Sequence, residues 1–568
     1  MSSKAGYSGP GTRPPRPYAG LTLVWAAIML LLTLTPAIDM PRTPAWKLLS
    51  FDTAAHAGVF AVLAVLSWFS LRRQRRWLQL ARRAGAAVLV GCILFGGLIE
   101  VLQYLMNVGR HAEWTDLAGD TLGAALALGV VVPAAILARR RGWALGLLFF
   151  LLSWPASAQD MPRARATLVR LASRRLHGRG YVNQGEHEAA AYLRGRLRQL
   201  GLQPLAPDFT QPFELDVNTF PGKLKLRLGA HTQLQAGRDF IAAPDAKSGF
   251  LRSAPLLPLD SLVFTDSVAA RRFIRLPLSQ QALLLREKDA VRLAQLPAQL
   301  RQHLDSAAAW VTLVPKLIAS LADKQAPQPR LELLSTACQP AFDDKLFLQL
   351  DAQLLRHYPT QNLCAVVRGT AQPDSFLVVT AHYDHLGMMG RKVYFPGAND
   401  NASGVALLLE LAGHYTRPEN RPACSIAFLL FGAEEAGLVG SSYFVAHPLV
   451  PLRQINFLVN LDLLGTGEEG ATVVNGRLHE AAFDQLQKLN AAGHYLPNLV
   501  ARGRAANSDH FPFSETGVPA FFIYTRGGSK AYHDVNDTPD KLSLAGFAGA
   551  FRLVRDFLNN RGAVAKHP

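Results

Sequence analysis

Residues 375–384 read Ser-Phe-Leu-Val-Val-Thr-Ala-His-Tyr-Asp, an apolar run that ends in a histidine, His382, and a carboxylate, Asp384. A short apolar run rich in valine indicates a strand that is buried on both faces, as in a parallel sheet. After residue 373 such runs alternate with helical patterns, of which residues 402–414 are one. The alternation predicts a three-layer α/β domain with a mostly parallel sheet.

Two more apolar runs end in side chains that can bind metal. Residues 426–431 lead into Glu434 and Glu435, and a third run leads into Asp462. In open α/β sheets the ligand crevice lies at the carboxyl ends of the strands. We therefore expect these carboxylates to converge with the histidine of the first run, although they are far apart in the sequence.

Histidine and carboxylate ligands without cysteine are typical of a catalytic zinc site that keeps a position open for water or substrate. Asp400 stands just before the helix that starts near Ala402, where its two oxygens could face two metal ions. Two ions bridged in this way, about 3.5–4 Å apart, can activate a water and polarise the scissile carbonyl. Of the adjacent glutamates, one could bind metal while its neighbour takes the proton from the water.

The order and spacing of these polar residues are distinctive. They lie in six strings: His382-Tyr383-Asp384, Gly397-Ala398-Asn399-Asp400-Asn401-Ala402-Ser403-Gly404, Glu434-Glu435-x-Gly437-Leu438-x-Gly440-Ser441, Asn460-Leu461-Asp462, Ser508-Asp509-His510 and Tyr532-His533-x-x-x-Asp537-Thr538. These strings resemble those of metallopeptidase family 28, the dizinc exopeptidases that include leucyl aminopeptidases and glutamate carboxypeptidases. The resemblance covers about residues 375–545 and, more weakly, residues 161–215.

The resemblance implies two zinc ions per site. One ion would be held by His382, Asp400 and Asp462. The other would be held by Asp400, Glu435 and His533, so that Asp400 bridges the two.

The resemblance also implies roles for residues that do not bind metal. Glu434 would be the general base and later the proton donor to the leaving amine, and Asp384 would hold the ring of the first histidine. Three neighbours are candidate pocket residues. Tyr532 either stabilises the oxyanion or packs, His510 is expected to form a pocket wall, and Asp509 either orients a ligand or caps a turn.

We expect the peptidase domain to comprise residues 159–214 and 341–568. Residues 215–340 between them carry short β-type runs, many turn residues and no chemical cluster. We interpret this stretch as a β-rich insertion, either a lid or a protease-associated-like module.

The N-terminal part of the chain is apolar and is followed by short arginine runs. Four apolar runs approach the roughly 20 residues that span a bilayer as a helix: residues 20–38, 53–70, 84–106 and 117–138. They predict a four-helix membrane domain over residues 20–140, preceded by a disordered segment over residues 1–19. Arginines after the second and fourth runs place those ends in the cytoplasm.

Polar residues at the ends of these runs resemble the VanZ-like family, which is associated with tolerance to glycopeptide antibiotics. They are Asp52, His56, Glu100, Gln103, Arg110, Trp114, Asp116 and Gly123. An ionisable group near the end of a membrane helix is costly unless it is paired. Glu100 is therefore a functional candidate, with Arg110 or His56 as its partner.

Residues 141–158 have the layout of a signal peptide and end in Ala156-Ser157-Ala158. They are either cleaved after Ala158, which would release the peptidase, or remain as a fifth span. Both interpretations place the peptidase outside the cytoplasm, while a third is that two reading frames were joined artificially.

Composition limits the choice of partners. Of the net charge of +17, +9 lies in the first 158 residues, which hold 15 lysines and arginines against six acidic residues, and no nucleic-acid motif accompanies it. The four cysteines are too few for a disulfide scaffold, although Cys338 and Cys364 could pair after export.

The resemblance thus implies an aminopeptidase, and the predicted topology has it act on peptides outside the cytoplasm and contact membrane lipid through its N-terminal domain. The alternatives are a glutamate-carboxypeptidase-like or glutaminyl-cyclase-like enzyme. A further alternative is an envelope protein of glycopeptide tolerance in which the peptidase is a passenger.

Overall fold

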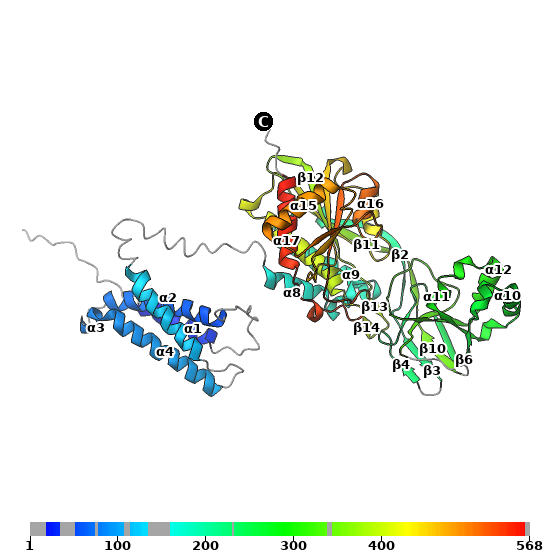
Figure 1. Cartoon of the computed structure of the whole chain (residues 1–568), viewed down its shortest axis with the longest axis horizontal. Coiled ribbons are helices and arrows are strands. Elements are labelled where there is room, and N and C mark those ends of the chain that lie inside the picture. Colours follow the sequence, from blue (N-terminus) through cyan, green and yellow to red (C-terminus); the bar gives the residue numbers. More distant parts are fainter. Residues whose placement is uncertain are drawn as a thin grey trace, which may run out of the picture. The chain divides into compact units, whose positions relative to one another are not determined.

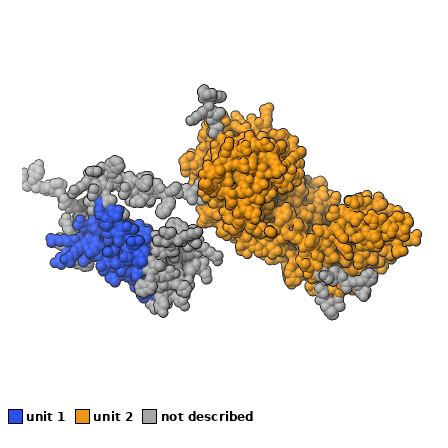
Figure 2. All heavy atoms as spheres, viewed as in Figure 1, with its two compact units in different colours: residues 1–156 blue, residues 157–568 orange. Residues whose placement is uncertain are grey.

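The computed structural model describes residues 19–33, 51–73, 78–106, 114–133, 160–229, 232–337 and 344–562. The chain divides into two compact units, residues 1–156 and 157–568 (Figure 2). The signal-like segment over residues 141–158 and Cys338 lie outside the described residues. Of the cysteines within them, Cys92, Cys364 and Cys424 are buried and free.

The first unit is helical, as predicted. Its helices are α1 (Ala19–Thr33), α2 (Phe51–Arg73), α3 (Leu78–Arg82), α4 (Ala84–Met106) and α5 (Trp114–Leu126), which a π-helical turn continues over Ala127–Val131. Phe60, Ile99 and Ala124 form its core. Gly123 lets α5 approach α2 closely, because a Cβ atom there would lie 2.0 Å from the carbonyl oxygen of Ala57.

Within the described residues, one helical stretch is long and apolar enough to cross a membrane, Ala84–Leu102 of α4. Three shorter apolar stretches accompany it: Gly20–Leu30, Ala57–Arg72 and Leu117–Val130. The predicted helical region is therefore confirmed, whereas the bundle of four spans stays a prediction. The side chains of Asp52, His56, Gln103, Trp114 and Asp116, and all of Arg110, lie outside the described part.

A nine-stranded mixed sheet forms the core of the second unit (Figure 1). Its central strands are β15 (Cys424–Phe431), β12 (Gln372–His382), β16 (Ile455–Leu461) and β19 (Ala520–Thr525), and these four run parallel. The flanking strands are β2 (Thr210–Thr219), β1 (Gln203–Pro204), β11 (Gln353–Val367), β17 (Ala471–Val474) and β18 (Leu499–Ala501).

The predicted mostly parallel sheet is thus parallel at its centre and mixed at its borders. β11 pairs antiparallel with β15 and β2, and β17 pairs antiparallel with β19. An apolar run reports burial on both faces but does not report the direction of a strand, so the sequence pattern could not distinguish these borders from the centre.

Alternate residues of the central strands face two helical layers. Leu377 and Val379 pack on one side, with α8 (Met161–Leu171), α9 (Gly185–Gln199), α13 (Gly404–Tyr415), α15 (Glu480–Gly493) and α17 (Phe547–Arg561). Phe376 and Val378 face the other side, where α14 (Val439–Ala446) and α16 (His510–Glu515) lie. The three-layer arrangement follows from this period of two along each strand.

The insertion forms a second sheet of eight strands. In spatial order they are β4 (Thr232–Leu234), β3 (Leu224–Leu228), β10 (Lys345–Leu350), β6 (Gly249–Pro258), β7 (Ala282–Arg286), β8 (Ala309–Val314), β9 (Arg330–Leu334) and β5 (Phe240–Ala242). The helices α10 (Ser267–Ile274), α11 (Glu287–Ala290) and α12 (Ala298–Leu304) belong to the same module, and the short hairpin β13 (Met388–Met389) and β14 (Val393–Tyr394) lies near it. This sheet extends to Leu350, beyond the predicted boundary at residue 340.

A buried arginine joins the N-terminal helices of the second unit to the central sheet. The Arg179 side chain is fully buried, and its guanidinium donates hydrogen bonds only to main-chain carbonyls. The acceptors, at 2.8–3.0 Å, are the oxygens of Leu171, Tyr383, Pro396, Gly397 and Asp400. Five bonds use the whole donor capacity of the guanidinium.

We predict that Arg179→Met lowers the free energy of unfolding by at least about 3 kcal/mol, since each buried carbonyl left without a donor costs about 1–3 kcal/mol. Arg179→Lys keeps the charge but has fewer N–H donors, so its free energy of unfolding should lie between those of the unaltered protein and Arg179→Met. The measurement is urea unfolding of the full chain followed by circular dichroism. Arg165→Met, at an exposed position of α8, is the control; equal unfolding midpoints for the two methionine variants would contradict the prediction.

Candidate metal centre

The ends of the parallel strands bring the predicted residues together. His382 ends β12 opposite Phe431 of β15, and Thr380 lies opposite Asn460 of β16. Because the strands end in register, the residues that follow them meet at one edge of the sheet. Asp462 lies there after β16, and Glu434 and Glu435 follow β15 by three and four residues.

Asp400 stands between two histidines. His382 Nε2 lies 3.3 Å from Asp400 Oδ1 and 3.5 Å from Asp462 Oδ1. His533 Nε2 lies 3.2 Å from Asp400 Oδ2 and 3.0 Å from Glu435 Oε2. The two oxygens of one carboxylate thus face two different imidazole rings.

The donor atoms also form compact groups. Potential ligand atoms of His382, Asp400 and Glu435 lie within 4.8 Å of one another, and those of His382, Glu434 and Asp462 form a second such group. Glu434, which the family pattern keeps off the metal, is therefore within reach of the same space as the proposed ligands.

Both rings present Nε2 to the carboxylates because Nδ1 is occupied elsewhere. His382 Nδ1 lies 3.3 Å from the main-chain oxygen of Asp384, and His533 Nδ1 lies 3.0 Å from that of Ala319. A carbonyl accepts a hydrogen bond, so Nδ1 carries the proton and Nε2 is the nitrogen left for a proton or a metal.

The carboxylates favour positive charge at these nitrogens. Burial lowers the pKa of His533, but Glu435 and Asp400 together raise it to about 11. Buried carboxylates in contact are costly without such a charge. Imidazole nitrogens and carboxylate oxygens are the donors that zinc takes in catalytic sites, so these residues fit zinc.

The Asp384 side chain lies near the His382 ring but bonds to a neighbouring loop. Its Oδ1 lies 3.8 Å from His382 Nδ1, while its two carboxylate oxygens accept the main-chain N–H groups of Glu434 at 3.1 Å and Glu435 at 3.3 Å. The side chain therefore fixes the loop after β15 beside the end of β12. Burial raises the pKa of Asp384 to about 7.

Glu434 and Glu435 differ in their surroundings. Burial raises the pKa of Glu434 well above its usual range, against the influence of His382. Burial acts in the same direction on Glu435, but His385 and His533 lower its pKa to about 2. His385 contacts Glu435 Oε1 through Nδ1 at 2.6 Å.

The three candidate pocket residues take different positions. Tyr532 is 44% exposed and stacks on the His533 ring, with centroids 3.9 Å apart. His510 is buried against Phe522, and burial lowers its pKa to about 4. Asp509 is also buried, and burial raises its pKa to about 7.

Several supporting residues were not assigned from the sequence. Asp537 accepts the main-chain N–H groups of Asn399 and Asp400 at 2.9–3.0 Å. Ser508 donates to Asp462 Oδ2 at 2.9 Å. Both lie in the quoted strings, so their positions were visible but their partners were not. Arg179 donates to the main-chain oxygen of Asp400 at 3.0 Å.

A cavity of about 550 Å³ adjoins this edge of the sheet. It is bordered by Asn399, next to Asp400, and by Tyr532, next to His533. The other large side chains of its wall are those of Leu463, Glu469, Tyr524, Arg526 and Lys530. Its size suits one side chain of a peptide and neighbouring main chain.

Two family profiles match the chain. Residues 362–558 match Peptidase family M28, and residues 21–138 match VanZ/LLP1.

Curated relatives resemble the peptidase part. Aminopeptidase YwaD of Bacillus subtilis (strain 168) is 32% identical over 208 residues, which cover 34% of this chain and 43% of that protein. Leupeptin-inactivating enzyme 1 of Streptomyces exfoliatus is 32% identical over 154 residues, which cover 27% of this chain and 33% of that protein. The chain thus spans less than half the length of these relatives.

A solved structure shares the fold. BSAP, a zinc aminopeptidase from Bacillus subtilis, aligns with a TM-score of 0.55 and 20% identity over 73% of this chain and 97% of its own. The second unit therefore has the fold of this aminopeptidase; within it residues 362–558 match Peptidase family M28, and in the N-terminal unit residues 21–138 match VanZ/LLP1.

Proposed function

We propose that this protein is a zinc-dependent aminopeptidase that binds two zinc ions and removes N-terminal residues from peptides. The observation that carries the proposal is the Asp400 carboxylate, whose two oxygens face the Nε2 atoms of His382 and His533. A carboxylate shared in this way is what two neighbouring cations require of a bridging ligand.

The proposed ligands divide into two sets that share Asp400. His382 and Asp462 would complete the set for one ion, and Glu435 and His533 the set for the other. When bound, the two ions would supply a Lewis acid for the scissile carbonyl and lower the pKa of a water.

Glu434 would move the proton. Its carboxylate lies within reach of His382 and Asp462, and its main-chain N–H is held by Asp384. From this position the carboxylate can accept the proton of the attacking water and return it to the leaving amine. Asp384 would thereby serve two functions, since it holds this loop and also faces the ring of His382.

Specificity for the N-terminus is supported by the names of the relatives, aminopeptidase YwaD among them. One observation favours the carboxypeptidase alternative: Arg526 and Lys530 border the cavity beside the site, where cations could meet a substrate carboxylate. Arg504 is less suitable because it pairs with Glu515. The second ligand set disfavours a cyclase, which uses one zinc ion.

We also propose that residues 19–133 attach the protein to a membrane and that the peptidase works outside the cytoplasm. The VanZ/LLP1 match and the apolar stretch Ala84–Leu102 support the attachment. The arginines beside the apolar runs support placing the peptidase outside the cytoplasm. An envelope function of the N-terminal region, with the peptidase as passenger, is the alternative that the same match favours.

We predict that Glu434→Gln lowers the rate of peptide hydrolysis by about 100- to 10,000-fold, the usual contribution of a general base. Its zinc content should not change, because the residue is not among the proposed ligands. Hydrolysis of a peptide and bound zinc are measured on the full chain. Glu419→Gln, at an exposed position, is the matched control; full activity of Glu434→Gln would refute the role of this residue.

Removal of metal provides an independent prediction. Incubation with phenanthroline should abolish hydrolysis, and added zinc should restore it, because neither carbonyl polarisation nor water activation remains without the ions. The assay follows hydrolysis before and after dialysis against zinc. If hydrolysis persists in protein that metal analysis shows to be free of metal, the protein is not a zinc enzyme.

Blocked peptides separate the enzymatic alternatives. The aminopeptidase should cleave peptides with a free N-terminus and leave their N-acetylated counterparts intact, because acetylation removes the charged amine and adds bulk at that end. Products are identified by mass spectrometry. Release of residues from the C-terminal end of acetylated peptides would favour the carboxypeptidase, and loss of water or ammonia from N-terminal glutamate or glutamine would favour the cyclase.

A further inference from the structure

The loop that carries His533 has no regular structure of its own. No helix or strand is assigned between Thr525 and the short turn Pro539–Lys541, and His533 itself has a positive φ of 53°. Neither a helix nor a ladder of main-chain bonds therefore orients the imidazole ring. Its orientation depends on contacts from other parts of the chain.

The insertion supplies such contacts through one segment, residues 315–322, which we call the arm. The main-chain oxygen of Ala319 accepts the hydrogen bond of His533 Nδ1 at 3.0 Å, and the Ala319 N–H donates to the main-chain oxygen of His533 at 2.9 Å. This reciprocal pair fixes both the ring and the backbone of one residue.

A lysine extends the contact on the same loop. Lys316 Nζ donates to the main-chain oxygen of Lys530 at 3.2 Å and lies 3.8 Å from Asp534 Oδ2. The arm therefore holds the loop on both sides of His533.

The arm is itself anchored by a buried asparagine at the end of β2. The Asn218 N–H donates to Ala322 O at 2.7 Å, and its side-chain amide donates to Pro244 O and Ala246 O at 2.9 Å each. Gln325 in turn donates to Asn218 Oδ1. Since β2 pairs with β11 of the central sheet, Asn218 links the arm to the peptidase core.

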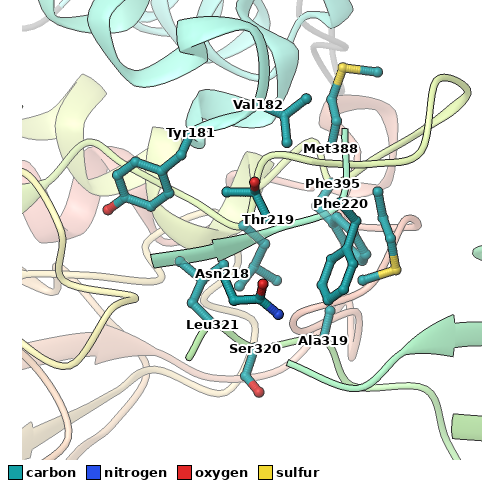
Figure 3. A pocket seen from close by; sticks show the side chains of 12 residues that line it. Tyr181, Val182, Asn218, Thr219, Phe220, Ala319, Ser320, Leu321, Met388 and Phe395 are labelled. Carbon is teal, nitrogen blue, oxygen red and sulfur yellow. The ribbon is translucent and has the colours of Figure 1, made fainter. Parts of the chain in front are cut away.

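The arm also packs tightly against that core. Figure 3 shows Ala319 beside Phe220 and Leu321 beside Asn218, and Met388 lines the same small cavity. The cavity holds about 20 Å³, enough for about one water molecule. Interiors packed this closely transmit small displacements, so a shift of the arm would be felt at the core.

Apolar side chains of the core complete this junction. Leu386 and Phe395, which flank the metal-binding strings, belong to the hydrophobic core of the insertion together with Leu226 and Leu346. Val535, two residues after His533, packs against the same core. The loop of His533 and the insertion therefore share one hydrophobic core.

From these contacts we infer that the arm is a positioning element of the proposed zinc site and acts on one ion of the two. It fixes the proton of His533 on Nδ1 and so directs Nε2 toward Asp400 and Glu435. The ion held by His382 and Asp462 has no such dependence, because its histidine ends a strand. The inference rests on the proposed function, in which His533 is a metal ligand.

The test is a zinc titration of the full chain after metal removal, in competition with a chelator, so that both dissociation constants are resolved. Asn218→Ala keeps the main-chain bond to Ala322 but removes the side-chain bonds that hold Asn218 itself in place and the bond from Gln325, three residues beyond the arm. We expect the variant to raise the dissociation constant of one of the two zinc ions by about tenfold or more, which is the usual effect of losing a contact behind a metal ligand. The dissociation constant of the other ion should change by less than about threefold.

A second variant and a control make the test decisive. Lys316→Met changes a side chain that is 44% exposed, so this variant should fold even if Asn218→Ala does not. It should raise the dissociation constant of the same zinc ion, but to a smaller extent. Asn475→Ala removes a buried asparagine that donates to Ala520 O, away from the arm, and should leave both ions unchanged.

Two results would overturn the inference. Both variants could bind two zinc ions as the unaltered protein does, which would show that the arm has no influence on the site. Alternatively, both ions could weaken equally, which would show a general loss of structure instead of the positioning of His533. Absence of any zinc uptake by the unaltered chain would overturn the proposed function itself, and this inference with it.

Discussion

The structure of the C-terminal half depends on keeping a buried carboxylate, that of Asp400, between two imidazole rings. Buried carboxylates that lie close together repel one another unless a positive charge, here on the histidines, lies among them. Each ring is held by a carbonyl at Nδ1, so that the opposite nitrogen must face the carboxylates. The strand ends, the loop after β15 and the insertion all serve to maintain this one arrangement.

Support for this arrangement comes mainly from the protein backbone. Arg179 binds five carbonyls, Asp537 binds two N–H groups, and Asp384 binds two more. Each of these side chains joins segments that are distant in the sequence. Bonds of this kind fix the path of the chain around the site and leave the ligand side chains free for metal.

The sequence made much of the site predictable, because apolar strands that end in His382 or Asp462 are visible without a structure. The helical layers followed from the same periodicity. The antiparallel borders of the sheet could not be predicted, since burial does not encode strand direction. Arg179 and Ala319 escaped notice for another reason: their partners are main-chain atoms, which every residue possesses and no motif records. The N-terminal runs predicted helices correctly, and within the described residues one stretch of them, Ala84–Leu102, is long and apolar enough to cross a membrane.

The contact of Ala319 with His533 also bears on how such enzymes can be rebuilt. Because the backbone makes both bonds, the identity of the side chain at this position matters little, whereas the course of the chain matters a great deal. A module transplanted from a relative would need to reproduce that course to within hydrogen-bonding distance. The insertion is therefore not an interchangeable module, and deleting it would remove the carbonyl that faces His533 Nδ1.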